Sequence, residues 1–230
     1  MTETAKTNKR EYYKVLIISP PGKGKTFSFR NVNPDTIGFM NIENKPLPFK
    51  NNFKYHFRPD SKSGDPISKD RVDINNTLVA YAKNPEIEAI GFDSLSAYMD
   101  MLLNEARATK KGYDIWNFYN EELGKFFTLV KKIQKEVIIT CHYEILGIEG
   151  NQEKRAKVKG KEWEGLIEKE FTIVLYGDNK FQDNGTPEYF FKTAEENASA
   201  KCPPGIFGEG TYKIPNDAKV LLEKIAEFAK

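Results

Sequence analysis

The feature that most constrains the fold is a short apolar run followed at once by a glycine-rich turn. Residues 15–18 read VLII, as a buried strand does, and residues 19–26 continue with SPPGKGKT. Gly22 and Gly24 carry no Cβ, so the backbone can turn sharply and aim successive N–H groups at an anion. A helix starting just after the turn would add the positive end of its dipole. Strand, turn and Gly-Lys-Thr ending together predict a phosphate-binding P-loop.

Two side chains of this turn have separate tasks in such a loop. Lys25 is placed to reach the β and γ phosphates of a nucleoside triphosphate, and Thr26 to give Mg²⁺ the hard oxygen ligand that this ion prefers. Ser19 stands where the motif usually opens with glycine. The plainer alternative is a surface Pro-Gly turn, which the preceding strand and the Lys-Thr pair disfavour. The expected nucleotide-binding residues are Pro21, Gly22, Lys23, Gly24, Lys25, Thr26 and Phe27.

Length and composition indicate one globular unit. The chain has 230 residues, of which 39% are hydrophobic, enough to fill a single core. We expect residues 1–13 to be a flexible tail and residues 14–230 to form one ATPase domain ending in a helix. The 35 Lys and Arg nearly balance the 33 Asp and Glu, so any nucleic-acid binding must come from local clustering. Two distant cysteines and the lack of a long apolar run favour a cytoplasmic protein without a disulfide framework, zinc ribbon or membrane span.

Strand and helix patterns alternate through the first two thirds of the chain. This order predicts an α/β fold of three layers, in which helices cover both faces of a mostly parallel sheet. A late pair of strands around the turn-rich sequence GDNKFQDNGTP predicts an antiparallel β-hairpin. The expected strands are 15–18, 36–42, 87–92, 137–141, 171–176 and 188–193, with a possible short one at 55–58, and the expected helices start at 26 and cover 70–83, 95–109, 114–133 and 218–230.

Polar residues follow three of the predicted strands. Ligands of such sheets bind outside the carboxyl ends of the strands, so Glu43, Asp93 and His142 are expected to meet the P-loop there. Asp93 is a candidate to hold Mg²⁺ opposite Thr26, although a strand-end aspartate can simply cap a helix. Glu43 is a candidate base for the attacking water, or else a surface residue. His142 is a candidate γ-phosphate sensor, or else a structural histidine.

Basic residues are concentrated in a polar, glycine-punctuated stretch, 147–160, which we expect to be a long functional loop. Its candidates for binding the phosphates of single-stranded DNA are Lys154, Arg155, Lys157 and Lys159, although a run of charges is often only solvated surface. Trp163 is either a stacking platform for bases or a core anchor. Lys161 and Lys201 are candidates to act in trans on a neighbouring subunit's nucleotide.

With these motifs in order, the chain resembles RecA-type P-loop ATPases. The resemblance rests on four motifs: SPPGKGKT, NIEN with Glu43, FDSLSAY with Asp93-Ser94, and IITCHYE with His142. More narrowly, the sequence is similar to small phage nucleotide-binding proteins of the single-strand annealing and recombination group. The resemblance implies ATP and Mg²⁺ as cofactors, ATP hydrolysis, single-stranded DNA as partner and a homo-oligomeric ring or filament. It also implies a phage single-strand binding or annealing protein as a second partner, in the host cytoplasm.

Three other classes of P-loop protein share such a nucleotide-binding loop. The main alternative is an ATP-driven loader or remodelling factor that acts on a protein partner without binding DNA. A nucleotide kinase is disfavoured because its lid needs several arginines, and after Arg107 the chain has only Arg155. A GTPase is disfavoured because Asn179-Lys180-Phe181 is followed by Gln182 where the base-reading aspartate belongs.

Overall fold

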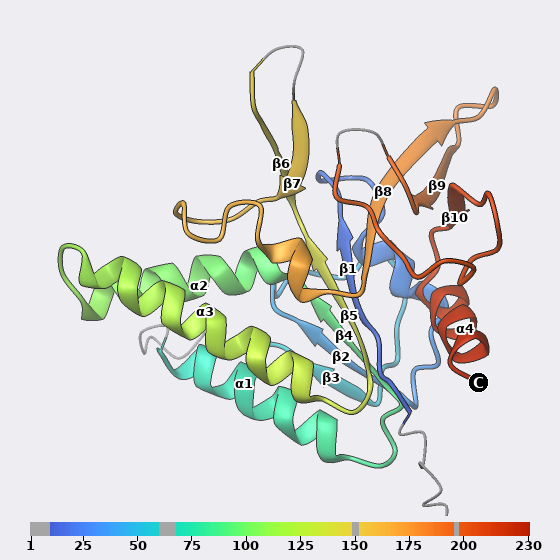
Figure 1. Ribbon diagram of the computed structural model, residues 1–230. Helices are drawn as coiled ribbons and strands as arrows, with labels where there is room; N and C mark the ends of the chain where they lie inside the picture. The colour runs from blue at the N-terminus through green and yellow to red at the C-terminus, as the bar shows by residue number, and fades with distance from the viewer. Residues whose placement is uncertain (1–9, 60–67, 149–151, 196–197) are drawn as a thin grey trace, which may run out of the picture.

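One large sheet organises the protein (Figure 1). The computed structural model describes residues 10–59, 68–148, 152–195 and 198–230. The sheet has eight strands in the order β10-β9-β8-β1-β5-β4-β2-β3. The strands from β8 to β3 in this order are parallel neighbours, whereas β9 runs antiparallel to β8 and to β10. Their bounds are β1 Lys14–Ile18, β2 Ile37–Asn41, β3 Tyr55–Phe57, β4 Ala89–Asp93, β5 Glu136–Cys141, β8 Ile173–Phe181, β9 Pro187–Lys192 and β10 Lys213–Pro215.

Helices cover both faces of this sheet, as predicted. Three long helices, α1 Ser68–Lys83, α2 Leu95–Thr109 and α3 Asp114–Lys132, lie on one face, and α4 Ala218–Phe228 lies on the other (Figure 1). Two separate clusters of buried side chains fill the spaces between the layers. The protein therefore has the three-layer α/β fold with a mostly parallel sheet that the alternation of strands and helices predicts.

The helix after the P-loop differs from the expectation. Residues Thr26–Asn31 form a 3₁₀ helix, η1, and the chain leaves helical geometry at Val32, just before Asn33-Pro34. A six-residue 3₁₀ helix has few aligned peptide dipoles, so it offers an anion less than a long α-helix does. The backbone N–H groups and Lys25 must supply most of the attraction for phosphate.

The basic stretch is a hairpin where a loop was expected. β6 Tyr143–Leu146 pairs antiparallel with β7 Glu153–Ala156 and rises above the carboxyl edge of the main sheet (Figure 1). The sequence prediction was wrong because these strands are short and polar, and tertiary contacts hold them. The Ala156 N–H donates to the buried Glu168 Oε1 at 2.8 Å, and the Tyr176 hydroxyl donates to the Lys154 carbonyl at 3.0 Å.

The late hairpin is confirmed but longer than predicted. β8 continues through Asp178 to Phe181, into the stretch that the sequence assigns to the turn. The ladder extends because Asp178 has partners on both sides, the ammonium groups of Lys23 at 3.0 Å and Lys192 at 3.2 Å. A second 3₁₀ helix, η2 Ile167–Glu170, precedes β8. Within the described ranges, no helix has the length and apolar content needed to cross a membrane.

The core between the sheet and α3 depends on aromatic packing, which gives a test of the fold. The Phe126 ring lies 4.4 Å from that of Tyr98 and 5.3 Å from that of Phe92 between centroids. We expect Phe126→Ala to lower the free energy of unfolding by about 3–5 kcal/mol, because it removes a buried ring and leaves a cavity. Denaturant unfolding of Phe181→Ala is the control, since Phe181 is 66% exposed on β8. Equal losses in the two variants would contradict this packing.

Candidate active site

Four neighbouring strands end at the same level and bring the predicted residues together. The strands β1, β5, β4 and β2 are consecutive in the sheet and parallel. At their ends the Ser19 N–H donates to the Cys141 carbonyl at 3.1 Å, and the Ile42 N–H donates to the Asp93 carbonyl at 2.7 Å. The P-loop, Glu43, Asp93 and His142 therefore lie close together at the carboxyl edge of the sheet.

The P-loop closes around its own lysine. The Lys25 ammonium donates to the carbonyls of Ser19 at 2.8 Å and Pro20 at 3.0 Å, inside the turn that should cradle phosphate. Gly22 and Gly24 have φ of 78° and 83°, the left-handed region that glycine adopts without strain. Burial lowers the pKa of Lys25 to about 8, against the opposing charges of Asp93 and Glu43.

Asp93 ties the P-loop to two strands. Its carboxylate accepts from the Thr26 hydroxyl at 2.7 Å through one oxygen and from the Thr140 hydroxyl through the other. Burial raises the pKa of Asp93, while the two hydroxyl donors and Lys25 act in the opposite direction. A carboxylate and a hydroxyl at this distance form the hard-oxygen pair that suits Mg²⁺, so these residues fit the expected ion.

Two donors hold the Glu43 carboxylate in place. Its carboxylate accepts from the Ser94 hydroxyl at 3.0 Å and from the Lys45 ammonium at 2.9 Å. Burial alone raises the pKa of Glu43, but these two donors and the charges of Lys45 and His142 outweigh it and leave the pKa below its ordinary value. Glu43 is therefore ionised near neutral pH, as a residue that orients water must be.

His142 lies between the lysine and the glutamate. Its Nδ1 is 3.3 Å from the Lys25 ammonium, and its Nε2 is 3.8 Å from Glu43 Oε1. Burial and the nearby Lys25 charge lower the pKa of His142, so the ring is neutral near pH 7. A charged Lys25 can only donate to Nδ1, which leaves the ring proton on Nε2, facing Glu43. The His142 N–H donates to the Ser96 hydroxyl at 2.9 Å, which fixes the backbone at this point.

A family comparison agrees with this geometry. The sequence profile described as an AAA domain matches residues 11–201. The chain belongs to the AAA domain family. This AAA domain is thus a P-loop ATPase, and nucleotide hydrolysis is the activity of its family.

Two further comparisons complete the picture. A KaiC-like protein from the hyperthermophilic archaeon Pyrococcus horikoshii OT3 is similar in structure, with 14% sequence identity, 83% of each chain covered and a TM-score of 0.48. No curated protein matches the sequence.

Three of the four candidate DNA-binding residues of the AAA domain form ion pairs with acids. Lys154 contacts Glu195 at 2.7 Å, Arg155 contacts Glu153 at 2.7 Å, and Lys159 contacts Asp100 at 2.7 Å. Lys157 and Lys161 are exposed and have no ion pair among the described residues. Lys201 is exposed where its backbone pairs with Val174 of β8. The pattern therefore leaves two cations of this stretch free to meet a phosphate.

Trp163 packs as a core anchor in this structure. Its ring lies 5.2 Å from that of Phe127 between centroids, and it borders the cluster under α3. The expectation of a base-stacking platform is not supported at this residue, because one side of its ring faces protein.

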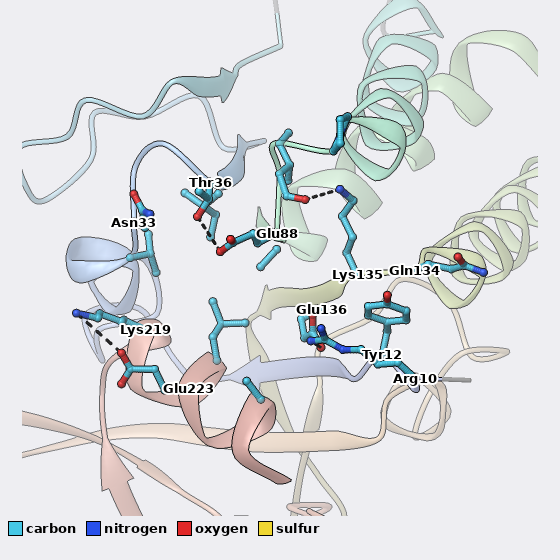
Figure 2. Close-up of a pocket in the computed structure, with 17 residues that line it drawn as sticks. Arg10, Tyr12, Asn33, Thr36, Glu88, Gln134, Lys135, Glu136, Lys219 and Glu223 are labelled. Atoms are coloured by element: carbon cyan, nitrogen blue, oxygen red, sulfur yellow. Dashed lines mark hydrogen bonds and ion pairs between the residues drawn. The ribbon is translucent and has the colours of Figure 1, made fainter. Parts of the chain in front are cut away.

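A cavity lies at the opposite edge of the sheet. It measures about 590 Å³ and lies among the amino ends of β2, β4 and β5 and the helix α4 (Figure 2). Four of the charges on its wall form ion pairs, Lys219 with Glu223 and Arg10 with Glu136. None of the predicted site residues lines it, so its size does not make it the active site.

The sequence missed several residues that position the site. Ser94 and Lys45 hold Glu43, Ser96 holds the backbone of His142, and Thr140 holds Asp93. One signal was available, since Thr140 is a hydroxyl inside the otherwise apolar strand VIITC. The others lie within three residues of a predicted site residue and became recognisable only when the strands were aligned.

The lowered pKa of Lys25 gives a test of this site. Near pH 8.5 a lysine with a pKa of about 8 is mostly neutral, and a bound triphosphate favours its charged form. We expect ATP binding to take up part of a proton near pH 8.5 and little near pH 7, where the lysine is already charged. Calorimetry in two buffers of different ionisation enthalpy measures the uptake.

Lys25→Arg is the matched control, because arginine keeps its charge at both pH values. Its uptake should not increase from pH 7 to pH 8.5. The same increase in the wild type and in Lys25→Arg would contradict the assignment to Lys25.

Proposed function

We propose that the protein is a Mg²⁺-dependent ATPase in which three residues, Lys25, His142 and Glu43, carry out catalysis. The observation that carries this proposal is the placement of the His142 ring, 3.3 Å from the Lys25 ammonium and 3.8 Å from Glu43. One neutral ring thus connects the lysine expected at the γ-phosphate with the carboxylate expected at the attacking water.

The roles follow from the charges and donors. The N–H groups of residues 21–27 and the Lys25 ammonium bind the phosphates, after Lys25 exchanges the carbonyls of Ser19 and Pro20 for phosphate oxygens. Thr26 and Asp93 would hold Mg²⁺, which supplies positive charge to the phosphate oxygens when bound. Glu43 orients the water and accepts its proton, while Ser94 and Lys45 keep its carboxylate in place. The His142 Nε2–H senses the γ-phosphate.

Removing the charge of Glu43 tests the catalytic role. Glu43→Gln keeps the shape and still accepts from Ser94, so ATP binding should persist while turnover falls at least about a hundredfold, in the range seen for general bases. Steady-state phosphate release and ATP affinity are the two measurements. Glu227→Gln, on the exposed surface of α4, is the control and should turn over like the wild type. Unchanged turnover in Glu43→Gln would exclude Glu43 as the base.

For the partner, we propose single-stranded DNA at the β6–β7 hairpin. A hollow of about 250 Å³ is lined by Pro21 of the P-loop, by His142 and by Lys157 and Lys159 of the basic stretch. A backbone phosphate bound by these lysines would lie next to the residue that senses the nucleotide. This neighbourhood offers a direct route by which DNA changes the rate of hydrolysis, in line with the phage annealing and recombination role that the sequence resembles.

Subunit assembly is part of the same proposal. A ring or filament of this chain would bring Lys161 or Lys201, both exposed, toward the nucleotide of a neighbour, where a cation stabilises transition-state charge. A phage single-strand binding or annealing protein is the further partner that this role implies.

A second candidate function has its own support. Three of the basic residues are neutralised by acids, and the same hairpin exposes Ile145 and, just after β6, Ile148, which is 79% exposed. An apolar tip beside paired charges suits a protein partner better than a phosphate backbone. The alternative is therefore an ATP-driven loader whose hairpin contacts a protein.

Salt-dependent stimulation separates these two functions. We expect single-stranded DNA to raise the ATPase rate of the wild type, and the double variant Lys157→Ala/Lys159→Ala to bind DNA less tightly with a smaller salt slope, because the two lysines that line the proposed phosphate site are lost. Fluorescence anisotropy at two salt concentrations measures the slope. Lys224→Ala on α4 is the control. No stimulation of the wild type at low salt would favour the loader.

A further inference from the structure

The side-chain amide of Asn216 is buried and has no hydrogen-bond partner among the described residues. It lies between β10 and α4, is 2% exposed, and neither its Nδ2 nor its Oδ1 has a hydrogen-bond partner within the described part of the chain. Leaving both ends of an amide buried and unpaired costs free energy, and proteins rarely do it without a reason. The backbone at this point is fixed, because the Asn216 carbonyl accepts from Arg30 Nη1 at 2.6 Å.

This amide lies against the P-loop. A Cβ added to Gly24 would come within 3.0 Å of Asn216 Nδ2 and 2.9 Å of Tyr189 Cδ1. Both side chains therefore touch the loop at a residue whose missing side chain makes their approach possible. The amide lies beside the loop that binds the phosphates, on the β8–β9 side of β1, away from Glu43.

Two aromatic rings and an arginine lie on this side of the P-loop. The rings of Phe27 and Tyr189 have centroids 5.8 Å apart, and the Arg30 guanidinium lies 4.3 Å from the Phe27 centroid. Aromatic faces and arginine planes are the surfaces on which nucleobases stack. Tyr189 also lines a hollow of about 340 Å³, together with Phe190 and Pro215.

We propose that Asn216 recognises the base of the bound nucleotide and that the base is adenine. This inference rests on the proposed nucleotide binding and adds its base subsite. An amide offers one donor beside one acceptor, which matches the amino group and neighbouring ring nitrogen of adenine in a bidentate pair. The base enters next to Phe27 as the Tyr189 ring moves aside, and Tyr189 then packs on its face. Binding thereby gives both ends of the Asn216 amide a hydrogen-bond partner.

The isosteric variant Asn216→Asp tests this recognition. A carboxylate has two acceptors and no donor, so it loses the adenine pair but can accept from the two N–H groups on the guanine edge. We expect ATP affinity to fall about tenfold or more, GTP affinity to fall less or rise, and the affinity for inorganic tripolyphosphate to stay within about twofold. Calorimetric titration of the full chain with the three ligands measures this. Asn184→Asp, in the turn after β8, is the matched control and should change none of them.

The outcomes separate the subsite from the P-loop. Unchanged ATP affinity in Asn216→Asp, or equal losses for ATP and tripolyphosphate, would overturn the inference, since Asn216 would then be only structural. A wild type that binds tripolyphosphate and ATP equally well would also overturn it, while leaving phosphate binding intact. A wild type that binds neither ligand would overturn the proposed function and this inference together.

A second pair of variants keeps the test independent of how well Asn216→Asp folds. Tyr189→Ala should lower ATP affinity about tenfold because it removes the stacking face, and Tyr189→Phe should keep it. Tripolyphosphate affinity should be unaffected in both. Equal ATP affinity in the two variants would contradict a base at Tyr189.

Discussion

The buried carboxylate of Asp93 is the interaction on which the rest of the site depends. It accepts from Thr26 of the P-loop and from Thr140 of β5, so three segments that are distant in the sequence meet at one group. A carboxylate this deeply buried needs such donors, because an unpaired buried charge is very costly. The position of Asp93 also fixes Glu43, because the next residue, Ser94, donates a hydrogen bond to the Glu43 carboxylate.

The charged groups of the site are paired with one another. Lys25 occupies the loop that would hold phosphate, His142 is neutral beside it, and Glu43 is ionised and fixed by Lys45. A triphosphate with Mg²⁺ brings the charges that this arrangement lacks, and it offers Lys25 stronger acceptors than the carbonyls of its own loop. On the other side of the P-loop, the buried amide of Asn216 has no hydrogen-bond partner among the described residues, which is the basis for proposing a base subsite there.

The surface of the β6–β7 hairpin does not point to one kind of partner. The β6–β7 hairpin carries cations, but acids such as Glu195 and Asp100 neutralise part of them. Exposed Ile145 on the same strands gives the hairpin a mixed character. Its base adjoins His142, so whatever binds there lies close to the nucleotide site.

The sequence by itself determined the parallel α/β core, the P-loop and the strand-end positions of Glu43, Asp93 and His142, because these depend on local apolar runs and on the polar residues that end them. Only the tertiary structure decided that η1 is a 3₁₀ helix, that the basic stretch is a hairpin with paired charges, and that Asn216 lies against Gly24. Asn216 comes 186 positions after Arg30 in the chain, in a stretch without a motif. Contacts between such distant segments come from strand order and packing, which no local pattern encodes.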